Sequence, residues 1–237
     1  EYDTATESFV RAAMSQDRGG VFLDDFASFR QKVAHLGAIN SLSQQLLKLT
    51  APGVPDLYQG TECWDFSLVD PDNRRPVDFE ARRAAFSALR RRKPGIALAT
   101  ELLEGYEDGR IKLYVTQRAL EVRQSLRNVF SHGEYERIEI TGTRAEHVVA
   151  FARRHESGDV IVAVPRLVAE LTGSEPGFPL GEATWGDTRL VLPPETHGWA
   201  YRDVFTGVAF TANDGDRSSM ALATLFNVLP LALLVRQ

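Results

Sequence analysis

Between Gln59 and Pro76 the sequence concentrates side chains that can exchange protons or make hydrogen bonds. The segment holds four carboxylates and two guanidinium groups: Glu62, Asp65, Asp70, Asp72, Arg74 and Arg75. Two carboxylates can act as general acid and general base when the fold fixes their separation. Glu62 and Asp65 stand three residues apart in an irregular stretch, which fixes no such separation. We therefore interpret this pair as solvated surface groups, not as a catalytic pair.

The run Asp70-Pro71-Asp72-Asn73 begins like a calcium-binding loop. An EF-hand loop needs glycine where Arg75 stands and glutamate where Ala81 stands, so the similarity ends there. The histidines are scattered without a His-x-x-x-His spacing, and Cys63 is the only cysteine, which removes the usual zinc patterns. We expect no metal and no cofactor. Two interpretations of residues 70–78 stay open, a self-contained turn network and contact with a ligand.

Composition excludes several classes of partner. The net charge of -5 and the isoelectric point near 5.6 argue against a nucleic-acid partner. The sequence has no apolar run long enough to cross a bilayer, so we expect no membrane partner. A single cysteine permits no internal disulfide, and a cytoplasmic location is expected. The chain begins with Glu1 instead of Met, which fits a piece of a longer protein.

The elements that must position the Gln59–Pro76 segment are helices. Apolar residues recur at steps of three or four from Phe26 to Leu49, which predicts one helix with a single apolar stripe, capped at its start by Asp24 or Asp25. Pro52 and Gly53 end it. A very short strand is expected at Leu57–Tyr58. Two further helices are predicted, over residues 79–92 and about 110–128. On the first of the three, His35 is expected to be a satisfied core residue.

After Phe130 the pattern changes to short runs rich in Val, Ile, Leu or aromatic residues. They predict an antiparallel sheet or sandwich whose strands cover residues 137–140, 148–152, 160–164, 189–192, 200–205 and 229–235. Residues 167–185 are expected to form a long loop. Trp185 and Trp199 are interpreted as core residues of this β unit, with sugar stacking as the alternative. The helical half should pack on the β half through the stripes of residues 26–49 and 110–129.

Four segments carry a resemblance to a known family. Residues 52–62 (Pro-Gly-Val-Pro-Asp-Leu-Tyr-Gln-Gly-Thr-Glu) and 68–78 (Leu-Val-Asp-Pro-Asp-Asn-Arg-Arg-Pro-Val-Asp) resemble the last strand and last active-site loop of an α-amylase-type barrel. More narrowly, they resemble the maltooligosyl trehalose synthases of glycoside hydrolase family 13. Residues 201–207 (Tyr-Arg-Asp-Val-Phe-Thr-Gly) and 229–234 (Leu-Pro-Leu-Ala-Leu-Leu) are similar to strands near the end of such enzymes.

The resemblance implies an α+β fold: the C-terminal end of a (β/α)8 barrel, with helices plus the last strand, followed by an antiparallel β-sandwich-like domain. It divides the chain into a helix-strand-helix part of the barrel at 1–93, a helical connector at 94–130 and the β domain at 131–237. The Leu57–Tyr58 strand would then lack neighbouring strands in this chain. Its unpaired edges would have to be covered by refolding, by dimerisation or by domain swapping.

The implied parent enzyme is a (1→4)-α-D-glucan 1-α-D-glucosylmutase, an isomerase of trehalose biosynthesis. It turns the reducing end of a maltooligosaccharide into an α,α-1,1-linked trehalose unit. In the family the catalytic Asp, Glu and Asp lie on earlier barrel strands, so no catalytic residue is carried over and this chain alone is expected to be inactive. Substrate binding is carried over to Tyr58, Gln59, Asp70, Asn73, Arg74 and Arg75. The oligomeric state is left open.

Three other functions remain open at this point. The chain is alternatively a non-catalytic carbohydrate-binding or structural module whose functional surface is the β unit. It is alternatively the end of another α-amylase superfamily glycosidase or glucosyltransferase. A complete enzyme of unrelated type is the last alternative. Tyr58 and Trp64 are the aromatic residues of the loop region that sugar stacking would use.

Overall fold

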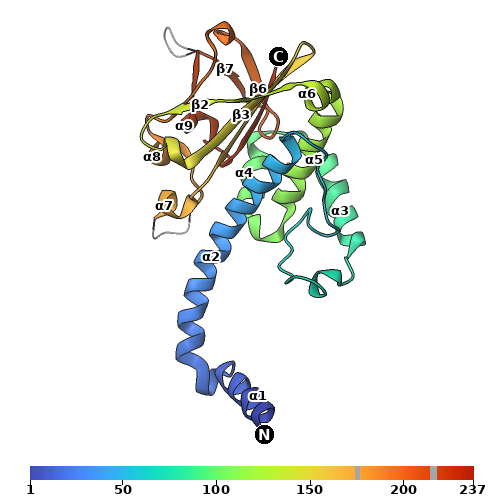
Figure 1. Cartoon of the computed structure of the whole chain (residues 1–237), viewed down its shortest axis with the longest axis vertical. Helices are drawn as coiled ribbons and strands as arrows, with labels where there is room; N and C mark the ends of the chain where they lie inside the picture. The colour runs from blue at the N-terminus through green and yellow to red at the C-terminus, as the bar shows by residue number, and fades with distance from the viewer. Residues whose placement is uncertain (174–176, 214–217) are drawn as a thin grey trace.

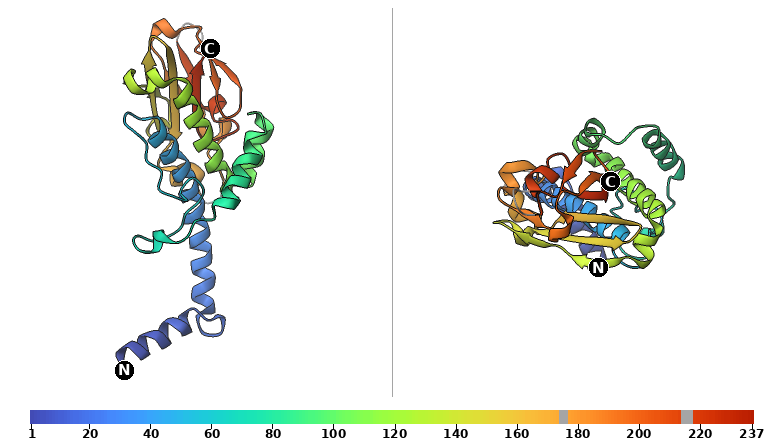
Figure 2. Two further views of the ribbon diagram at one scale, coloured as in Figure 1. Left: turned by 90° about the vertical axis from the view of Figure 1, so that its right-hand side faces the viewer. Right: turned by 90° about the horizontal axis from the view of Figure 1, so that it is seen from above.

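The computed structural model describes residues 1–173, 177–213 and 218–237. Within these ranges a layer of helices covers one face of a six-stranded antiparallel sheet, and a three-stranded sheet lies against the other face. Figures 1 and 2 show this body, from which the N-terminal helices project as a long arm. Over the same ranges, none of the helices combines the length and apolar character needed to cross a bilayer.

The helical layer is built from elements in the first half of the chain. The α-helices there are α1 (Tyr2–Ala13), α2 (Gln16–Thr50), α3 (Phe79–Arg90), α4 (Ile96–Glu104), α5 (Arg110–Ser125) and α6 (Arg127–His132). Short 3-10 turns are η1 (Asp72–Arg74) and η2 (Tyr106–Asp108). The predicted helices over residues 79–92 and 110–128 are confirmed as α3 and α5. The helix α4 lies in the segment expected only as a helical connector.

The predicted start of α2 is wrong. The helix begins at Gln16, so Asp24 and Asp25 lie in its interior and cap nothing; Ser15 holds the N-cap position. No proline interrupts residues 16–25, so the hydrogen-bond ladder continues through them although they offer no apolar stripe to the body. Gly19 permits the tight turn from α1, because a Cβ there would come within 1.8 Å of the Ala13 carbonyl oxygen.

The single apolar stripe predicted on α2 is also wrong. Three consecutive steps of three residues lead from Val33 through Leu36 and Ile39 to Leu42. Each step falls about 60° short of a full turn, so together they rotate the apolar positions by about half a turn around the helix. Only the second half of the helix packs on the body of the protein. There Ile39, Leu42, Leu46 and Leu49 are buried.

The predicted antiparallel sheet is confirmed. Within the described residues, the larger sheet has the order β1 (Glu134–Arg137), β3 (Val148–His155), β4 (Gly158–Pro165), β9 (Ala232–Arg236), β6 (Ala200–Asp203) and β7 (Ala209–Thr211). The smaller sheet contains β2 (Glu139–Thr141), β5 (Arg189–Val191) and β8 (Ser219–Ala221). The strand predicted at 137–140 is in fact split between the two sheets around the buried Ile138. The three-residue strands β7 and β8 were not predicted, because so short a run shows no alternation.

The segment 167–185 is not simply a loop. It contains α7 (Val168–Thr172) and α8 (Gly181–Trp185), while residues 174–176 lie outside the described ranges. The remaining short elements are η3 (Ala145–His147), η4 (Pro194–Thr196) and α9 (Leu222–Leu225).

Strand β4 joins two hydrophobic cores. Val160, Val162 and Val164 point into the core shared with the helices, whereas Ile161 and Ala163 point into the core between the sheets. All five are fully buried, as expected for a central strand covered on both faces. The predicted packing of the helices on the β half is confirmed for α5 and for the second half of α2. It is wrong for the first half of α2, whose Phe26 and Phe29 are exposed.

The core interpretation of Trp185 is confirmed. Its ring is fully buried against Phe226, and its indole N–H donates to the Pro179 carbonyl at 2.9 Å. Trp199 is partly buried beside the same core, and the Arg236 guanidinium lies 3.4 Å above its ring centroid. Trp185 therefore has no ring face open to a sugar, and one face of the Trp199 ring is covered by Arg236.

The 201–207 motif forms a buried turn at the end of β6. The Asp203 carboxylate accepts from the Thr206 N–H at 2.8 Å, from the Thr206 hydroxyl at 2.6 Å and from the Leu233 N–H at 3.3 Å. Burial is the main cause that raises the pKa of Asp203. The Tyr114 hydroxyl of α5 donates to the Phe205 carbonyl at 2.7 Å, and burial raises the pKa of Tyr114 to about 12. The motif therefore ties β6 to β9 and to the helical layer.

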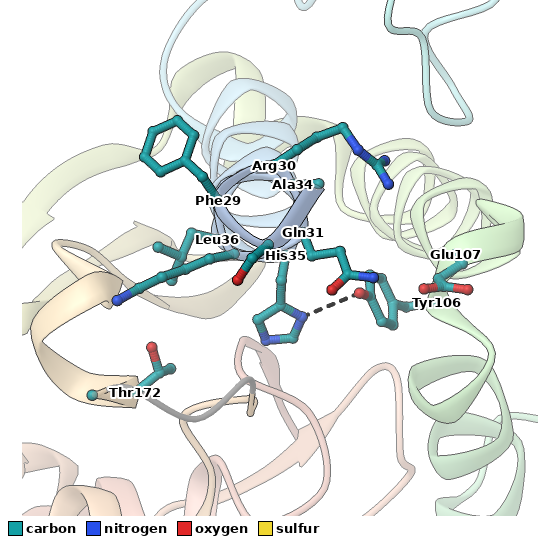
Figure 3. Close-up of a pocket in the computed structure, with 12 residues that line it drawn as sticks. Phe29, Arg30, Gln31, Ala34, His35, Leu36, Tyr106, Glu107 and Thr172 are labelled. Carbon is teal, nitrogen blue, oxygen red and sulfur yellow. Dashed lines mark hydrogen bonds between the residues drawn. The ribbon is translucent and has the colours of Figure 1, made fainter. Parts of the chain in front are cut away.

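His35 is a satisfied core residue, as the sequence predicted. Its Nδ1 lies 3.2 Å from the Tyr106 hydroxyl (Figure 3). Its Nε2 lies 2.9 Å from the Gly177 carbonyl oxygen. The carbonyl can only accept, so Nε2 carries the proton and Nδ1 accepts from Tyr106. The Phe178 ring packs edge-on against both rings.

The strand expected at Leu57–Tyr58 is absent. Both residues are part of an irregular stretch between α2 and α3, and they pair with no strand in the described part of the chain. A parallel strand needs hydrogen-bonding neighbours at its sides, and no such neighbour lies there within the described residues. The barrel end is therefore not formed by this chain alone.

Candidate functional site

The six candidate residues lie on the connection between α2 and α3, in two groups. This connection lies beside α3 at the outside of the helical layer (Figure 1). Tyr58 and Gln59 are exposed, as are Asp70, Arg74 and Arg75. Asn73 is partly buried. The structure therefore places the candidates on one surface loop, where all of them except Asn73 are exposed.

Asp70 to Arg75 form the turn network that was one of the two interpretations. The Arg74 guanidinium pairs in a bidentate manner with the Asp70 carboxylate, with N–O distances of 2.5 and 2.7 Å. Arg75 pairs with Asp72, whose other oxygen accepts from the Leu68 N–H at 2.8 Å. These ion pairs are exposed, and such pairs contribute little to stability in water. Their members remain free to exchange partners with a polar ligand.

Asn73 differs from its neighbours in this network. Its side-chain oxygen is buried and has no hydrogen-bond partner in the described part of the chain. A buried carbonyl oxygen without a donor costs free energy. Asn73 is thus the position in the loop where a donor from outside the described residues would be most favourable.

Glu62 and Asp65 are each engaged with a neighbouring side chain. Glu62 is half-buried and pairs with Arg82 of α3 at 2.7 Å, while Arg82 also donates to the Gly60 carbonyl at 3.1 Å. Asp65 accepts from the Ser67 hydroxyl at 2.6 Å and from its N–H at 2.9 Å. These two hydrogen bonds lower the pKa of Asp65.

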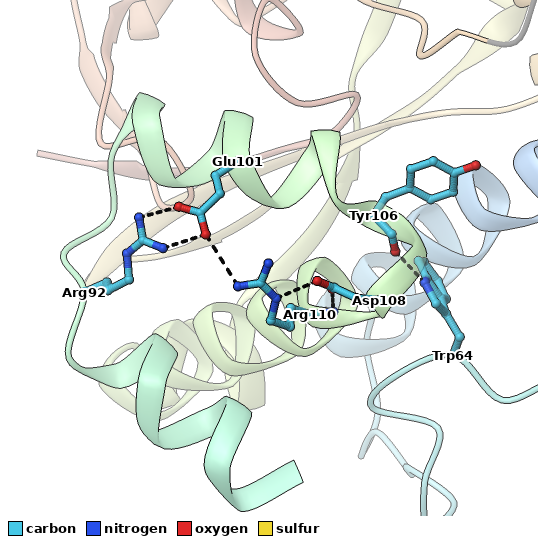
Figure 4. A network of polar contacts seen from close by, with 6 residues as sticks. All are labelled: Trp64, Arg92, Glu101, Tyr106, Asp108 and Arg110. Carbon is cyan, nitrogen blue, oxygen red and sulfur yellow. Dashed lines mark hydrogen bonds and ion pairs between the residues drawn. The ribbon is translucent and has the colours of Figure 1, made fainter. Parts of the chain in front are cut away.

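Trp64 anchors the loop to the helical layer. Its indole N–H donates to the Tyr106 carbonyl at 2.6 Å, as Figure 4 shows. Gly109 has a positive φ of 79°, and a Cβ there would lie 3.2 Å from the backbone nitrogen of Trp64. The Lys112 ammonium lies 5.5 Å from the ring centroid. With Lys112 over its ring and Gly109 close by, Trp64 is a packing residue, and Tyr58 is the more accessible aromatic side chain of the loop.

Lys112 is a cation at this anchor with little access to water. The residue is 8% exposed, and burial lowers the pKa of its ammonium, with a smaller effect from the charge of Lys48. Burial likewise raises the pKa of the neighbouring Cys63. Both directions indicate that the Trp64 contact is poorly hydrated.

A chain of ion pairs fixes the helices behind this anchor. Arg92 at the end of α3 pairs with Glu101 of α4 at 2.7 Å, and Glu101 also lies 3.4 Å from Arg110. Arg110 in turn pairs with Asp108 at 2.7 Å (Figure 4). The hydrogen bond from Arg92 is the main cause that lowers the pKa of Glu101.

Two arginines that the sequence analysis did not single out hold the start of the loop. Arg123 of α5 donates to the Leu49 carbonyl at 3.1 Å and to the Gly53 carbonyl. Arg153 of β3 is buried and donates to the carbonyls of Thr50, Phe130 and Gly133 at 3.3, 3.0 and 3.0 Å. Carbonyls at helix ends lack intrahelical donors and attract cations. Desolvation lowers the pKa of both guanidinium groups.

One sequence signal could have identified Arg153. It stands inside an apolar strand run, Val-Val-Ala-Phe-Ala-Arg-Arg-His at 148–155, where a charged side chain needs buried acceptors. Arg123 has no comparable signal, because one arginine on an amphipathic helix looks like any solvated residue. Within the described residues, no group of three or more His, Cys, Asp or Glu side chains is arranged to hold a metal ion.

Comparisons with curated proteins and with solved structures both find maltooligosyl trehalose synthases. No protein-family model matches the chain. Over 207 residues, 86% of this chain, the sequence is 38% identical to two proteins named "Putative maltooligosyl trehalose synthase", from Mycobacterium tuberculosis strains CDC 1551 and H37Rv. The matched region covers 22% of each of those proteins.

Solved structures give the same result. The structure of maltooligosyltrehalose synthase from Arthrobacter ramosus matches with a TM-score of 0.71 and 33% identity, covering 96% of this chain and 26% of that chain. A crystal structure of another maltooligosyl trehalose synthase matches with a TM-score of 0.68 and 27% identity, covering 100% of this chain and 26% of that chain. The chain thus spans about a quarter or less of the length of these proteins. The resemblance to the maltooligosyl trehalose synthases that the sequence predicted is therefore confirmed, over a part of those enzymes.

Proposed function

We propose that this chain is the portion of a longer maltooligosyl trehalose synthase that supplies a substrate-binding loop and a structural β domain. The parent enzyme would convert the reducing end of a maltooligosaccharide into an α,α-1,1-linked trehalose unit, as a cytoplasmic member of glycoside hydrolase family 13. The observation that carries the proposal is the extent of the match. It runs over 86% of the chain in sequence and 96% in structure, instead of being confined to one common element.

The proposal assigns residues 1–93 to the end of a (β/α)8 barrel, 94–130 to a connector and 131–237 to the β domain, which is sandwich-like. Leu57 and Tyr58 would become the last barrel strand once neighbouring strands from the longer protein lie beside them. Two features support this. Leu57 and Tyr58 lie between two helices, which is the chain order of a barrel strand, and they lack strand partners within the described residues.

Within this proposal, the α2–α3 loop contacts sugar. Tyr58 offers an exposed ring for stacking, and Gln59 follows it directly. Asp70, Arg74 and Arg75 would exchange part of their exposed ion pairs for sugar hydroxyls, which both donate and accept. Asn73 would gain the donor that its buried oxygen lacks.

The catalytic Asp, Glu and Asp are proposed to lie in the longer protein outside this sequence. Glu62 and Asp65 are engaged in structural contacts within the described part of the chain, which supports the inactivity of the chain alone. The purified chain should leave maltopentaose unchanged, whereas the longer enzyme should convert it into a non-reducing isomer. Turnover of maltopentaose by this chain alone would contradict the proposal.

Variants of the longer enzyme test the loop. Arg74→Met should lower kcat/KM for maltopentaose about tenfold, because the bidentate donor is lost. Arg137→Met, on the exposed face of β1, is the matched control and should leave turnover unchanged. Equal activity of the two variants would remove Arg74 from the site. If free glucose or maltose is the main product of the longer enzyme, that enzyme is a hydrolase of the same superfamily and not a mutase.

A further inference from the structure

The first half of α2 presents an apolar face that this chain does not cover. Phe22, Phe26, Phe29 and Val33, called here the arm stripe, recur at steps of four and three and share one side of the helix. They are between 46% and 64% exposed. The half-turn rotation described above places this stripe on the side of α2 opposite to Ile39, Leu42, Leu46 and Leu49. The helix therefore buries one side in this chain and offers the other side, farther along, to solvent.

Helix α1 enlarges the exposed surface. Its large apolar side chains are also exposed: Tyr2, Phe9, Val10 and Met14. Figures 1 and 2 show α1 and the first half of α2, residues 2–33, projecting as an arm away from both sheets. Contiguous apolar surface of this kind marks an interaction site on a stable protein.

A hollow at the base of the arm continues this surface. A cavity of about 600 Å3 lies beside residues 28–36 of α2 (Figure 3). Phe29, Lys32 and Leu36 line it on α2, and Tyr106 lines it on η2. The hydrogen bond between His35 and Tyr106 forms part of its wall. A side chain of a molecule bound along the arm stripe could occupy this cavity.

The charges on the arm indicate which class of molecule could cover its apolar face. Five acidic and four basic residues are interspersed along it: Asp3, Glu7, Arg11, Asp17, Arg18, Asp24, Asp25, Arg30 and Lys32. An anionic lipid surface or a nucleic acid would favour a basic face. Mixed charges around an apolar centre are typical of contact with another protein surface.

We propose that the arm stripe docks onto the part of a longer synthase chain that lies outside this sequence, so that α2 belongs to two hydrophobic cores. This inference rests on the proposed function, because it takes its occupant from the longer enzyme. The lengths support it: one solved synthase matches 100% of this chain, arm included, yet 74% of that solved chain lies outside the match. A second copy of this chain is the competing occupant.

The test compares one set of substitutions in two settings. The variant Phe22→Gln, Phe26→Gln, Phe29→Gln is made in this 237-residue chain and in the intact longer enzyme. Asp17→Ser, Asp24→Ser, on the opposite side of the same helix, is the matched control. In the short chain both variants should melt like the unchanged chain, because the arm stripe is already exposed. In the longer enzyme only the phenylalanine variant should lower the melting temperature, with amide exchange over residues 22–33 at least about 10-fold faster.

Two results would overturn the docking. One is equal melting and exchange of the phenylalanine variant and the control in the longer enzyme. The other is a dimer of the short chain that the phenylalanine variant dissolves while the longer enzyme is unaffected, which assigns the stripe to a second copy. Product analysis separates this inference from the function. If the phenylalanine variant destabilises a longer enzyme that forms no trehalose unit, the docking stands and the proposed function is wrong. If the longer enzyme forms trehalose units and the phenylalanine variant behaves like the control, the docking alone is wrong.

Discussion

Two turns of this molecule begin with an aspartate and differ in what surrounds that residue. Asp203 starts a turn at the end of β6 in which the carboxylate is buried and accepts from Thr206 and Leu233. Asp70 starts a turn in the α2–α3 loop in which the carboxylate is exposed and pairs with Arg74. Both belong to segments that carry the family resemblance. The family resemblance alone therefore does not tell whether such an aspartate is committed to the fold or is exposed to solvent.

Burial makes that separation. Removing one partner from a buried, satisfied group leaves the others without hydrogen bonds and costs their full desolvation. Removing one partner from an exposed ion pair returns the other to water at little cost. The Asp203 turn is thus committed to the fold, while the Asp70 turn is available to a ligand. Four substitutions can break or sharpen this contrast.

The largest effect is expected at the buried turn. Asp203→Ala removes the acceptor of two backbone N–H groups and one hydroxyl, and should lower the free energy of unfolding of this chain by about 3 kcal/mol. Urea unfolding measures it. Asp70→Ala is the matched control and should change the free energy by less than about 0.5 kcal/mol. Similar losses for both variants would erase the contrast between the two turns.

A second large effect is expected at the start of the loop. Arg153→Met keeps the apolar bulk but leaves the carbonyls of Thr50, Phe130 and Gly133 without their donor. We expect a loss of about 2 kcal/mol and faster amide exchange in residues 50–53. Arg137→Met on neighbouring β1 serves as the control. A loss confined to the sheet, with unchanged exchange at 50–53, would show that Arg153 does not position the loop.

A pH-dependent effect is expected at the Trp64 contact. Burial lowers the folded pKa of Lys112 below its ordinary value of 10.5, so the unfolded chain binds the proton more tightly than the folded one. The stability of the unchanged chain relative to Lys112→Met should therefore rise as the pH increases from the lowered pKa toward 10.5. Chemical unfolding at several pH values from 7 upward measures the difference. A flat difference would place the ammonium in water.

The smallest effect on folding is expected in the candidate loop itself. Arg74→Ala should alter the free energy of unfolding by less than about 0.5 kcal/mol, because its pair with Asp70 is exposed. The same substitution should weaken maltooligosaccharide turnover in the longer enzyme. If it instead destabilises this chain by as much as Asp203→Ala does, the loop is a structural turn and the sugar-contact interpretation of residues 70–78 is wrong.

The sequence predicted the regular elements that bury a repeating pattern. Strands β3, β4, β5, β6 and β9 and helices α3 and α5 follow from apolar runs and periodicity, which reflect local burial. The start of α2 was missed because a projecting helix has no core to set its pattern. The strand expected at Leu57–Tyr58 does not form, because a strand depends on neighbours that the local sequence cannot reveal. The family resemblance located the candidate loop, yet the ion pair of Glu62 with Arg82 joins residues that no short motif connects.

The arginine at position 153 links regions that lie far apart in the chain. Its guanidinium reaches from a central sheet strand to the last turn of α2 and to the end of α6. The loop that carries Tyr58 and Arg74 therefore does not form an autonomous unit. Grafting that loop onto another scaffold, or truncating the protein after residue 130, would keep its covalent structure but remove the hydrogen bond from Arg153 to Thr50. The loop would therefore keep its conformation only together with the sheet.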